Sequence, residues 1–168
     1  GRMPAYKGEV MVTSIVTMFK KIKLDTHENL GFGPVNLPEL EMHTSAVMIT
    51  VPAQIFDGMS KEDAQSGMLG IATLLKNIAP LHLMCSPWDI ACTYHVRDPF
   101  TNMPTVYLYD TVAGGIGLSD KVYEIVGDLF VHALEALCDC RCQSGCPSCV
   151  GPLGGKAYAL KILRRLLA

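Results

Sequence analysis

The chain has few charged residues and no long apolar run. Only 18% of its 168 residues are Asp, Glu, Lys or Arg, whereas 49% are hydrophobic. This apolar share exceeds that of an average soluble domain. No apolar run reaches the ~18 residues that a membrane-spanning helix requires. We therefore expect a globular domain with a real core and an apolar face that packs against another domain.

The sequence also lacks an excess of positive charge. Lys and Arg number 14 and Asp and Glu number 16, which gives a formal net charge of −2 at pH 7. This balance excludes a general attraction to nucleic acid, so any DNA contact must come from a local basic patch. Phosphate-facing and merely solvated roles are both open for two basic groups. They are Lys20, Lys21 and Lys23, and, near the C-terminus, Arg141, Lys156, Arg164 and Arg165.

Motifs of self-sufficient catalysis are missing as well. The chain contains no Gly-x-Ser-x-Gly elbow, no His-Glu-x-x-His and no paired-carboxylate motif. The glycine-rich run AGGIG at residues 113–117 is not a P-loop, because no Gly-Lys-Ser/Thr follows it. Its position favours either a tight turn or a seat for an anion. We expect no enzymatic activity from this chain alone.

Cysteine, by contrast, is concentrated in one place. Five of the seven cysteines lie in the run CDCRCQSGCPSC at residues 138–149. The spacing C-x-C-x3-C-x2-C suits a tetrahedral zinc ion held by Cys140, Cys142, Cys146 and Cys149. Four thiolates leave no open coordination position, so this zinc is expected to be structural. Cys138 is interpreted as a spare at the end of the preceding helix.

Other interpretations of the cluster remain open from the sequence. A disulfide framework is disfavoured because the number of cysteines is odd. An iron–sulfur cluster also uses four thiolates, but its common spacings differ. A catalytic Cys-x-x-Cys pair is expected at a strand-to-helix junction instead.

The periodicity of the chain predicts an α+β fold, with a mainly antiparallel sheet of about four strands, packed helices and a C-terminal four-cysteine zinc knuckle. Expected strands are 6–23, 44–51, 91–97 and 105–110, and expected helices are 63–79, 122–137 and 156–167. Residues 29–38 are predicted to be a loop. Pro80 is expected to end or kink the first helix, and Gly67 and Gly70 to allow a close backbone crossing. A cross-strand cluster is predicted for Tyr94, Tyr107 and Tyr109.

No second domain is marked in the sequence. We interpret residues 1–168 as one domain with a cysteine loop at 138–152. Residues 1–3 are interpreted as a cloning remnant.

From Leu108 to Pro152 the sequence resembles a known family. The segments LYDTVAGGIGLSDKVYE and CRCQSGCPSCVGP, joined by a long helix, are similar to the C-terminal zinc-binding domain of the mitomycin repair (MrfA-like) family of superfamily-two DEAD/DEAH-box DNA helicases. Weaker similarity extends upstream through LMCSPWDI and LPELEMHTSAV. By this resemblance the family's zinc ligands correspond to Cys140, Cys142, Cys146 and Cys149.

The resemblance implies that this chain is one accessory domain of a larger protein, a DNA helicase. Such helicases use two RecA-like motor domains to hydrolyse ATP and move 3′-to-5′ on single-stranded DNA in DNA repair. It implies a cytoplasmic, nucleoid-associated protein in which this domain docks on the motor and helps guide the strand. Two alternatives remain: a zinc-stabilised protein-interaction module without DNA contact, and an iron–sulfur or redox domain.

Overall fold

The computed structural model describes residues 4–168, so the interpretation of residues 1–3 lies outside the described residues. It has the predicted α+β architecture. Four antiparallel strands form the main sheet in the order β1-β4-β6-β5. Their bounds are Ala5–Ser14 for β1, Leu40–Thr50 for β4, Thr105–Asp110 for β6 and Ile90–His95 for β5.

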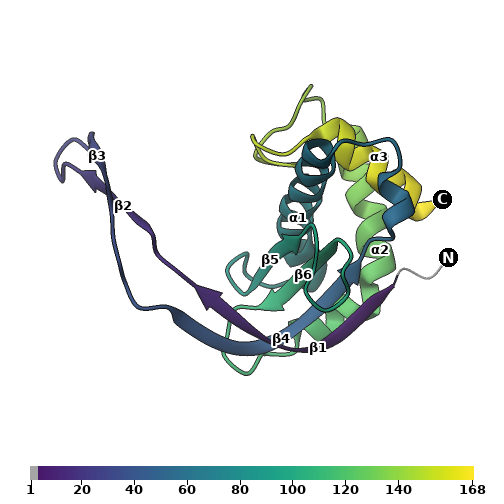
Figure 1. Ribbon diagram of the computed structural model, residues 1–168, viewed down its shortest axis with the longest axis horizontal. Helices are drawn as coiled ribbons and strands as arrows, with labels where there is room; N and C mark the ends of the chain where they lie inside the picture. Colours follow the sequence, from purple (N-terminus) through teal and green to yellow (C-terminus); the bar gives the residue numbers. More distant parts are fainter. Residues whose placement is uncertain (1–3) are drawn as a thin grey trace.

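Two of the three helices pack on one face of this sheet, and the last helix packs on the other two (Figure 1). The three helices are α1 (Lys61–Leu83), α2 (Leu118–Asp139) and α3 (Lys156–Leu167), and a 3-10 turn, η1 (Ala53–Phe56), precedes them. The core lies between the sheet and the helices, because alternate residues of the central strands, such as Val47 and Leu108, are fully buried there. Within residues 4–168, no helix combines the length and apolar content that crossing a bilayer needs.

Helix α1 departs from the prediction at its C-terminal end. Pro80 lies inside the helix, which continues to Leu83 and ends at Met84 in the left-handed conformation, with φ 52°. Proline removes one backbone hydrogen bond. Here Pro80 is buried, and the packing of the last turn offsets that loss.

The expected close crossing at the glycines of α1 is confirmed. A Cβ on Gly67 would meet the backbone of Tyr158 at 3.2 Å, and one on Gly154 would lie 2.9 Å from the Cα of Gly70. Small residues therefore let α1 approach both α3 and the end of the cysteine loop.

The prediction of one strand over residues 6–23 is wrong, and of the predicted loop at 29–38 the first part, residues 29–34, forms a strand. The chain leaves the main sheet after β1, and β2 (Met18–Ile22) pairs with β3 (Asn29–Pro34) in a separate two-stranded ribbon. Figure 1 shows this ribbon far from the helices, at the end of an extended segment. We call residues 15–39 the arm. Its β-branched and aromatic residues favour strands, but no second layer covers them.

The predicted tyrosine cluster is also wrong. Tyr94 pairs with Val106, whereas Tyr107 pairs with Thr93, so Tyr94 and Tyr107 lie on opposite faces of the sheet. His95 takes the place beside Tyr107, with the ring centroids 5.6 Å apart in an edge-to-face arrangement.

Candidate metal centre

The cysteine loop connects α2 to α3 at one end of the helical layer. Helix α2 ends at its C-cap residue, Cys140, whose backbone N–H still donates to the carbonyl of Ala136. The apolar stripe of α2 fixes the direction in which the chain enters the loop, because Leu129, Ala133 and Leu137 are fully buried. The first sulfur is therefore positioned by a rigid element.

The four sulfurs chosen from the spacing come together. The side-chain ligand atoms of Cys140, Cys142, Cys146 and Cys149 all lie within 4.8 Å of one another. Four of the sulfur–sulfur distances among them are 3.4–3.6 Å. A zinc ion with Zn–S bonds of about 2.3 Å needs sulfurs about 3.8 Å apart in a tetrahedron. The loop can therefore hold one four-coordinate metal ion.

These distances bear on the alternatives for the cluster. A disulfide needs sulfurs about 2.05 Å apart, and all seven cysteines are free. A multi-iron cluster places several iron and sulfide atoms between its ligands, for which sulfurs at 3.4–3.6 Å leave no room. Cys138 is exposed in the last turn of α2 and is not among the four converging sulfurs.

A tight turn aims the last two sulfurs inward. The N–H of Cys149 and that of Gly151 both donate to the carbonyl of Cys146, at 3.0 and 2.9 Å. The N–H of Cys146 in turn points at the sulfur of Cys149, at 3.3 Å. Gly145 precedes this turn with φ 148°, and a Cβ there would lie 2.6 Å from the carbonyl oxygen of Gly151. Glycine adopts this positive φ without steric cost.

In the metal-free loop, the pKa values of two of the four thiols shift in opposite directions. Hydrogen bonds from the backbone N–H and thiol of Cys142, and from the thiol of Cys146, lower the pKa of Cys140 to about 7. Desolvation, followed by interactions with the other thiols, raises the pKa of Cys142 to about 12. One thiol is therefore ready to ionise near neutral pH, whereas another needs a metal ion to displace its proton.

Two side chains brace the loop from neighbouring helices. The buried ammonium of Lys156, at the start of α3, donates to the carbonyls of Cys140 and Cys142 at 2.5 and 2.8 Å. Asn77 of α1 donates to the carbonyls of Pro147 and Cys149 at 3.0 and 3.4 Å. The loop is thus tied to α1, α2 and α3 together.

The four basic residues considered for nucleic acid have different surroundings. Arg141 and Arg164 are exposed, and Arg164 lies 3.9 Å from the sulfur of Cys138. Lys156 is only 8% exposed. Arg165 donates to the carbonyls of Ile55 and Asp57 at 2.7 and 2.8 Å. Lys156 and Arg165 therefore direct their donors into the chain itself.

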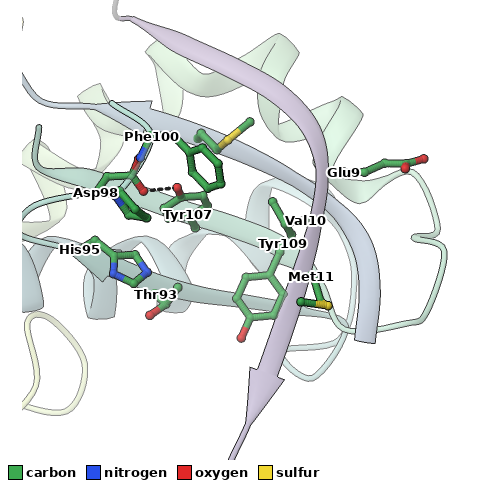
Figure 2. Close-up of a pocket in the computed structure, with 11 residues that line it drawn as sticks. Glu9, Val10, Met11, Thr93, His95, Asp98, Phe100, Tyr107 and Tyr109 are labelled. Carbon is green, nitrogen blue, oxygen red and sulfur yellow. Dashed lines mark hydrogen bonds between the residues drawn. The ribbon is translucent and has the colours of Figure 1, made fainter. Parts of the chain in front are cut away.

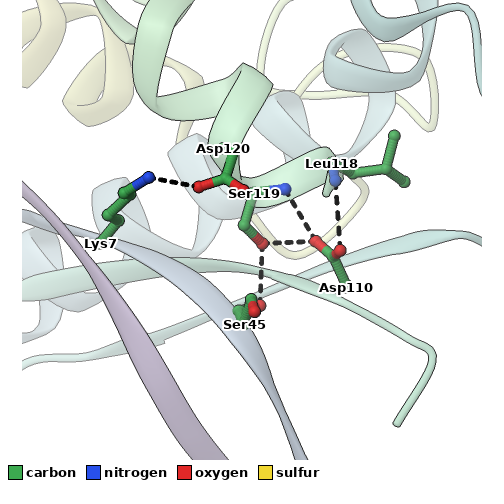
Figure 3. A network of polar contacts seen from close by, with 6 residues as sticks. All are labelled: Lys7, Ser45, Asp110, Leu118, Ser119 and Asp120. Carbon is green, nitrogen blue, oxygen red and sulfur yellow. Dashed lines mark hydrogen bonds and ion pairs between the residues drawn. The ribbon is translucent and has the colours of Figure 1, made fainter. Parts of the chain in front are cut away.

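The glycine-rich turn holds a carboxylate of the chain's own. Buried Asp110 accepts hydrogen bonds from the backbone N–H groups of Ile116, Leu118 and Ser119, at 2.7, 3.2 and 2.8 Å. The Ser119 hydroxyl also bonds to Asp110 and to the carbonyl of Ser45 (Figure 3). The N–H groups at the start of α2 are therefore occupied by the Asp110 carboxylate, which favours a tight turn over a binding site for an external anion.

A hollow of about 510 Å³ lies on the helix-free face of the sheet. Figure 2 shows His95, Phe100, Tyr107 and Tyr109 around it, with β1 passing in front. Burial opposes the ionisation of Asp98, but bonds from the Tyr107 hydroxyl and the N–H groups of Thr101 and Phe100 lower its pKa. Asp98 therefore anchors the β5–β6 loop.

Sequence reasoning missed two features of this region. It treated Lys156 as a surface cation, because a lysine at a helix start carries no mark of being buried. It also gave no sign that His82 of α1 and His132 of α2 stack, with their ring centroids 4.6 Å apart. Only the packing of the two helices brings these distant residues together.

Comparison with known proteins agrees with this geometry. Residues 71–150 match the family model described as the MrfA Zn-binding domain. The chain is 37% identical over 150 residues to the uncharacterized ATP-dependent helicase YprA of Bacillus subtilis, covering 89% of this chain and 20% of that protein. It is 32% identical over 80 residues to an uncharacterized protein of Methanocaldococcus jannaschii, covering 43% of this chain and 71% of that protein.

A solved structure is similar as well. The crystal structure of the DUF1998 helicase MrfA bound to DNA superposes with a TM-score of 0.75 and 36% identity, over 96% of this chain and 22% of that one. The chain thus spans about a fifth of the length of the two helicases that it matches. With a matching domain model, converging thiols and these relatives, the chain belongs to the family of proteins that carry the MrfA Zn-binding domain.

Proposed function

We propose that this chain is the zinc-binding accessory domain of an ATP-dependent 3′-to-5′ DNA helicase that acts in DNA repair. The observation that carries the proposal is the convergence of four thiols in a domain whose relatives include helicases. The motor domains lie elsewhere in the longer polypeptide, and residues 1–168 form one non-catalytic unit. The whole protein works in the cytoplasm, on the nucleoid.

The zinc ligands in this proposal are Cys140, Cys142, Cys146 and Cys149. The ion occupies a closed site and takes no part in chemistry, because four thiolates leave no position for water or substrate. Its role is to make a loop with little core of its own rigid. Rigidity supports docking on the motor and guidance of the single strand, since both need a surface of constant shape.

Direct DNA contact by this domain is part of the proposal. A relative was solved bound to DNA, which supports a position near the strand. Arg141 and Arg164 are the stronger candidates for phosphate contact because their side chains are exposed. Lys156 and Arg165 would first have to release the carbonyls that they now bind.

The deciding experiment uses the longer protein that contains this chain. We expect one zinc per polypeptide by elemental analysis, and ATP-dependent unwinding of a duplex with a 3′ single-stranded tail. Substitution of Arg141 and Arg164 by Gln should weaken binding of single-stranded DNA and make it less salt-dependent, by a slope of about 0.7 per lost phosphate contact. Absence of unwinding would refute the helicase assignment. Unchanged DNA binding would favour a protein-interaction module.

A further inference from the structure

The arm carries an unusual share of the exposed apolar surface. Of 21 large hydrophobic side chains that are exposed in residues 4–168, nine belong to the 25 residues of the arm. The strands of its ribbon pack on each other and not on the helices (Figure 1). Single exposed apolar residues are normal, but their concentration in one segment indicates an interaction surface.

The ribbon has two distinct faces. Met18 pairs with Pro34 and Lys20 with Phe32, so these four side chains share a face. Met18 and Phe32 are 63% and 64% exposed. On the opposite face the ring of Phe19 lies over Gly33, where a Cβ would be only 2.7 Å away. We call the first the open face of the ribbon.

An isolated two-stranded ribbon is at best marginally stable in water, and three strands or a packed partner are needed for independent stability. The arm has neither, although its backbone pairing is regular apart from one irregularity between Lys21 and Ile22. A partner that covers the open face would supply the missing layer. We therefore expect a partner to cover the open face of the ribbon.

The charge of the arm separates a protein partner from a nucleic acid. Its three lysines are balanced by Asp25, Glu28 and Glu39, so the arm has no net positive field to attract phosphates. Its exposed apolar side chains are mostly aliphatic, and aliphatic side chains offer no platform for stacking bases. The surface fits an apolar groove in a protein.

The source of that groove follows from the length of the relatives. This chain corresponds to about a fifth of each matched helicase, so under the function proposed above most of the polypeptide lies outside it. Domains of one polypeptide meet at a high effective concentration. A groove in the same chain therefore has an advantage over one in a second copy.

We propose that the arm is a docking strap, whose open face inserts into an apolar groove of another domain of the same longer polypeptide. Met18 and Phe32 are its anchors. The inference rests on the proposed function, because it requires that longer polypeptide. It differs from a DNA-guiding role for the cysteine end of the domain, since Figure 1 places the arm far from the cysteine loop.

The test places a photoreactive p-benzoylphenylalanine in the intact longer protein, with single-stranded DNA present. One variant carries it in place of Phe32, on the open face, and the matched control carries it in place of Phe19, on the opposite face. We expect the Phe32 probe to join peptides within one polypeptide, to residues outside this domain, in several-fold higher yield than the Phe19 probe. Cross-links between two copies or to DNA, no cross-link, or equal yields from both probes would overturn the proposal.

A second measurement does not depend on the probe. The double variant Met18→Ser with Phe32→Ser in the intact protein is expected to speed amide exchange in β2 and β3 at least about tenfold, because hot-spot anchors carry most of an interface. Exchange in β5 and β6 should stay constant, which shows that the domain is folded. Unchanged exchange in β2 and β3 would contradict the strap.

The two proposals fail in different ways. Cross-linking needs neither ATP hydrolysis nor unwinding. An inactive motor with the cross-link formed would refute the helicase function alone, and an active motor without the cross-link would refute the strap alone.

Discussion

At the scale of single residues, Lys156 is the side chain whose position most needs an explanation. It is 8% exposed, and among residues 4–168 no carboxylate pairs with it. Burial of an unpaired ammonium is costly. Its neighbours are the carbonyls of Cys140 and Cys142, and four thiolates around one Zn²⁺ carry a net charge of −2. The metal site would therefore supply both its hydrogen-bond acceptors and its counter-charge.

This reasoning predicts that Lys156→Met weakens zinc binding. Groups that orient metal ligands typically change metal affinity by about 10–100-fold when they are removed, so we expect a loss in that range. The measurement is competition for zinc with a chromophoric chelator, and Lys161→Met on the exposed side of the same helix is the matched control. Equal zinc affinity in the two variants would show that Lys156 is only a packing residue.

The cysteines themselves allow a more severe change. Cys146→Ser or Cys149→Ser removes one thiolate, and structural zinc contributes apparent binding free energies of about 10–16 kcal/mol. That is comparable with the whole stability of a domain. We expect loss of zinc and unfolding of at least the last thirty or so residues, seen by elemental analysis and circular dichroism. Cys138→Ser is the control, and stoichiometric zinc with unchanged melting in both ligand variants would count against the assignment.

At the scale of elements, the junction between β6 and α2 depends on one carboxylate. Asp110 ends β6 and accepts the N–H groups that open α2, so a strand end and a helix start are locked together. Gly114, Gly115 and Gly117 have φ of 75–85°, which allows the turn to fold back over Asp110. Helix α2 then leads directly to Cys140.

Replacing this carboxylate should loosen the junction. Asp110→Asn puts an amide where several donors converge and leaves buried N–H groups poorly satisfied, so we expect the free energy of unfolding to fall by about 1–3 kcal/mol. Urea denaturation measures the change. Asp120→Asn, which breaks only the exposed pair with Lys7, should have little effect (Figure 3). Equal effects of the two substitutions would rule out a special role for Asp110.

At the scale of the whole molecule, the cysteine loop joins all three helices. Asn77 ties it to α1, Cys140 caps α2 and Lys156 begins α3. The opposite end of the molecule is the arm, which has no such ties (Figure 1). Loss of metal should therefore loosen the helical end while leaving the pairing of β2 with β3 unchanged.

Metal retention should depend on pH for the whole domain. Because the pKa of the metal-free Cys142 thiol is raised to about 12, zinc must displace its proton at every pH below that value. A fall in pH adds protons that compete with the metal, so affinity should drop at least about tenfold per pH unit below pH 8. Chelator competition at pH 6, 7 and 8 measures this slope. A pH-independent affinity would mean that the sulfurs are not the ligands.

Several features could be predicted from the sequence because their causes are local. The spacing of the cysteines and the turn at Gly145 bring the sulfurs together through local geometry. The buried apolar face of α2 follows from helical periodicity alone. The bounds of α3 and β6 were predicted correctly for the same reason. Where periodicity was ambiguous, as in residues 6–23, the prediction failed, since apolar residues on both faces suit a covered strand and an uncovered arm equally.

The sequence by itself determined the kind of metal site, the α+β class and the family, because these follow from residue types at short spacing. Only the tertiary structure decided which lysine is buried and which strands stand apart. Those features depend on contacts between residues far apart in the chain, such as Lys156 with Cys140 or Asn77 with Cys149. The sequence gives the chemical type of each side chain, whereas the burial and the contacts of that side chain depend on how the folded molecule packs.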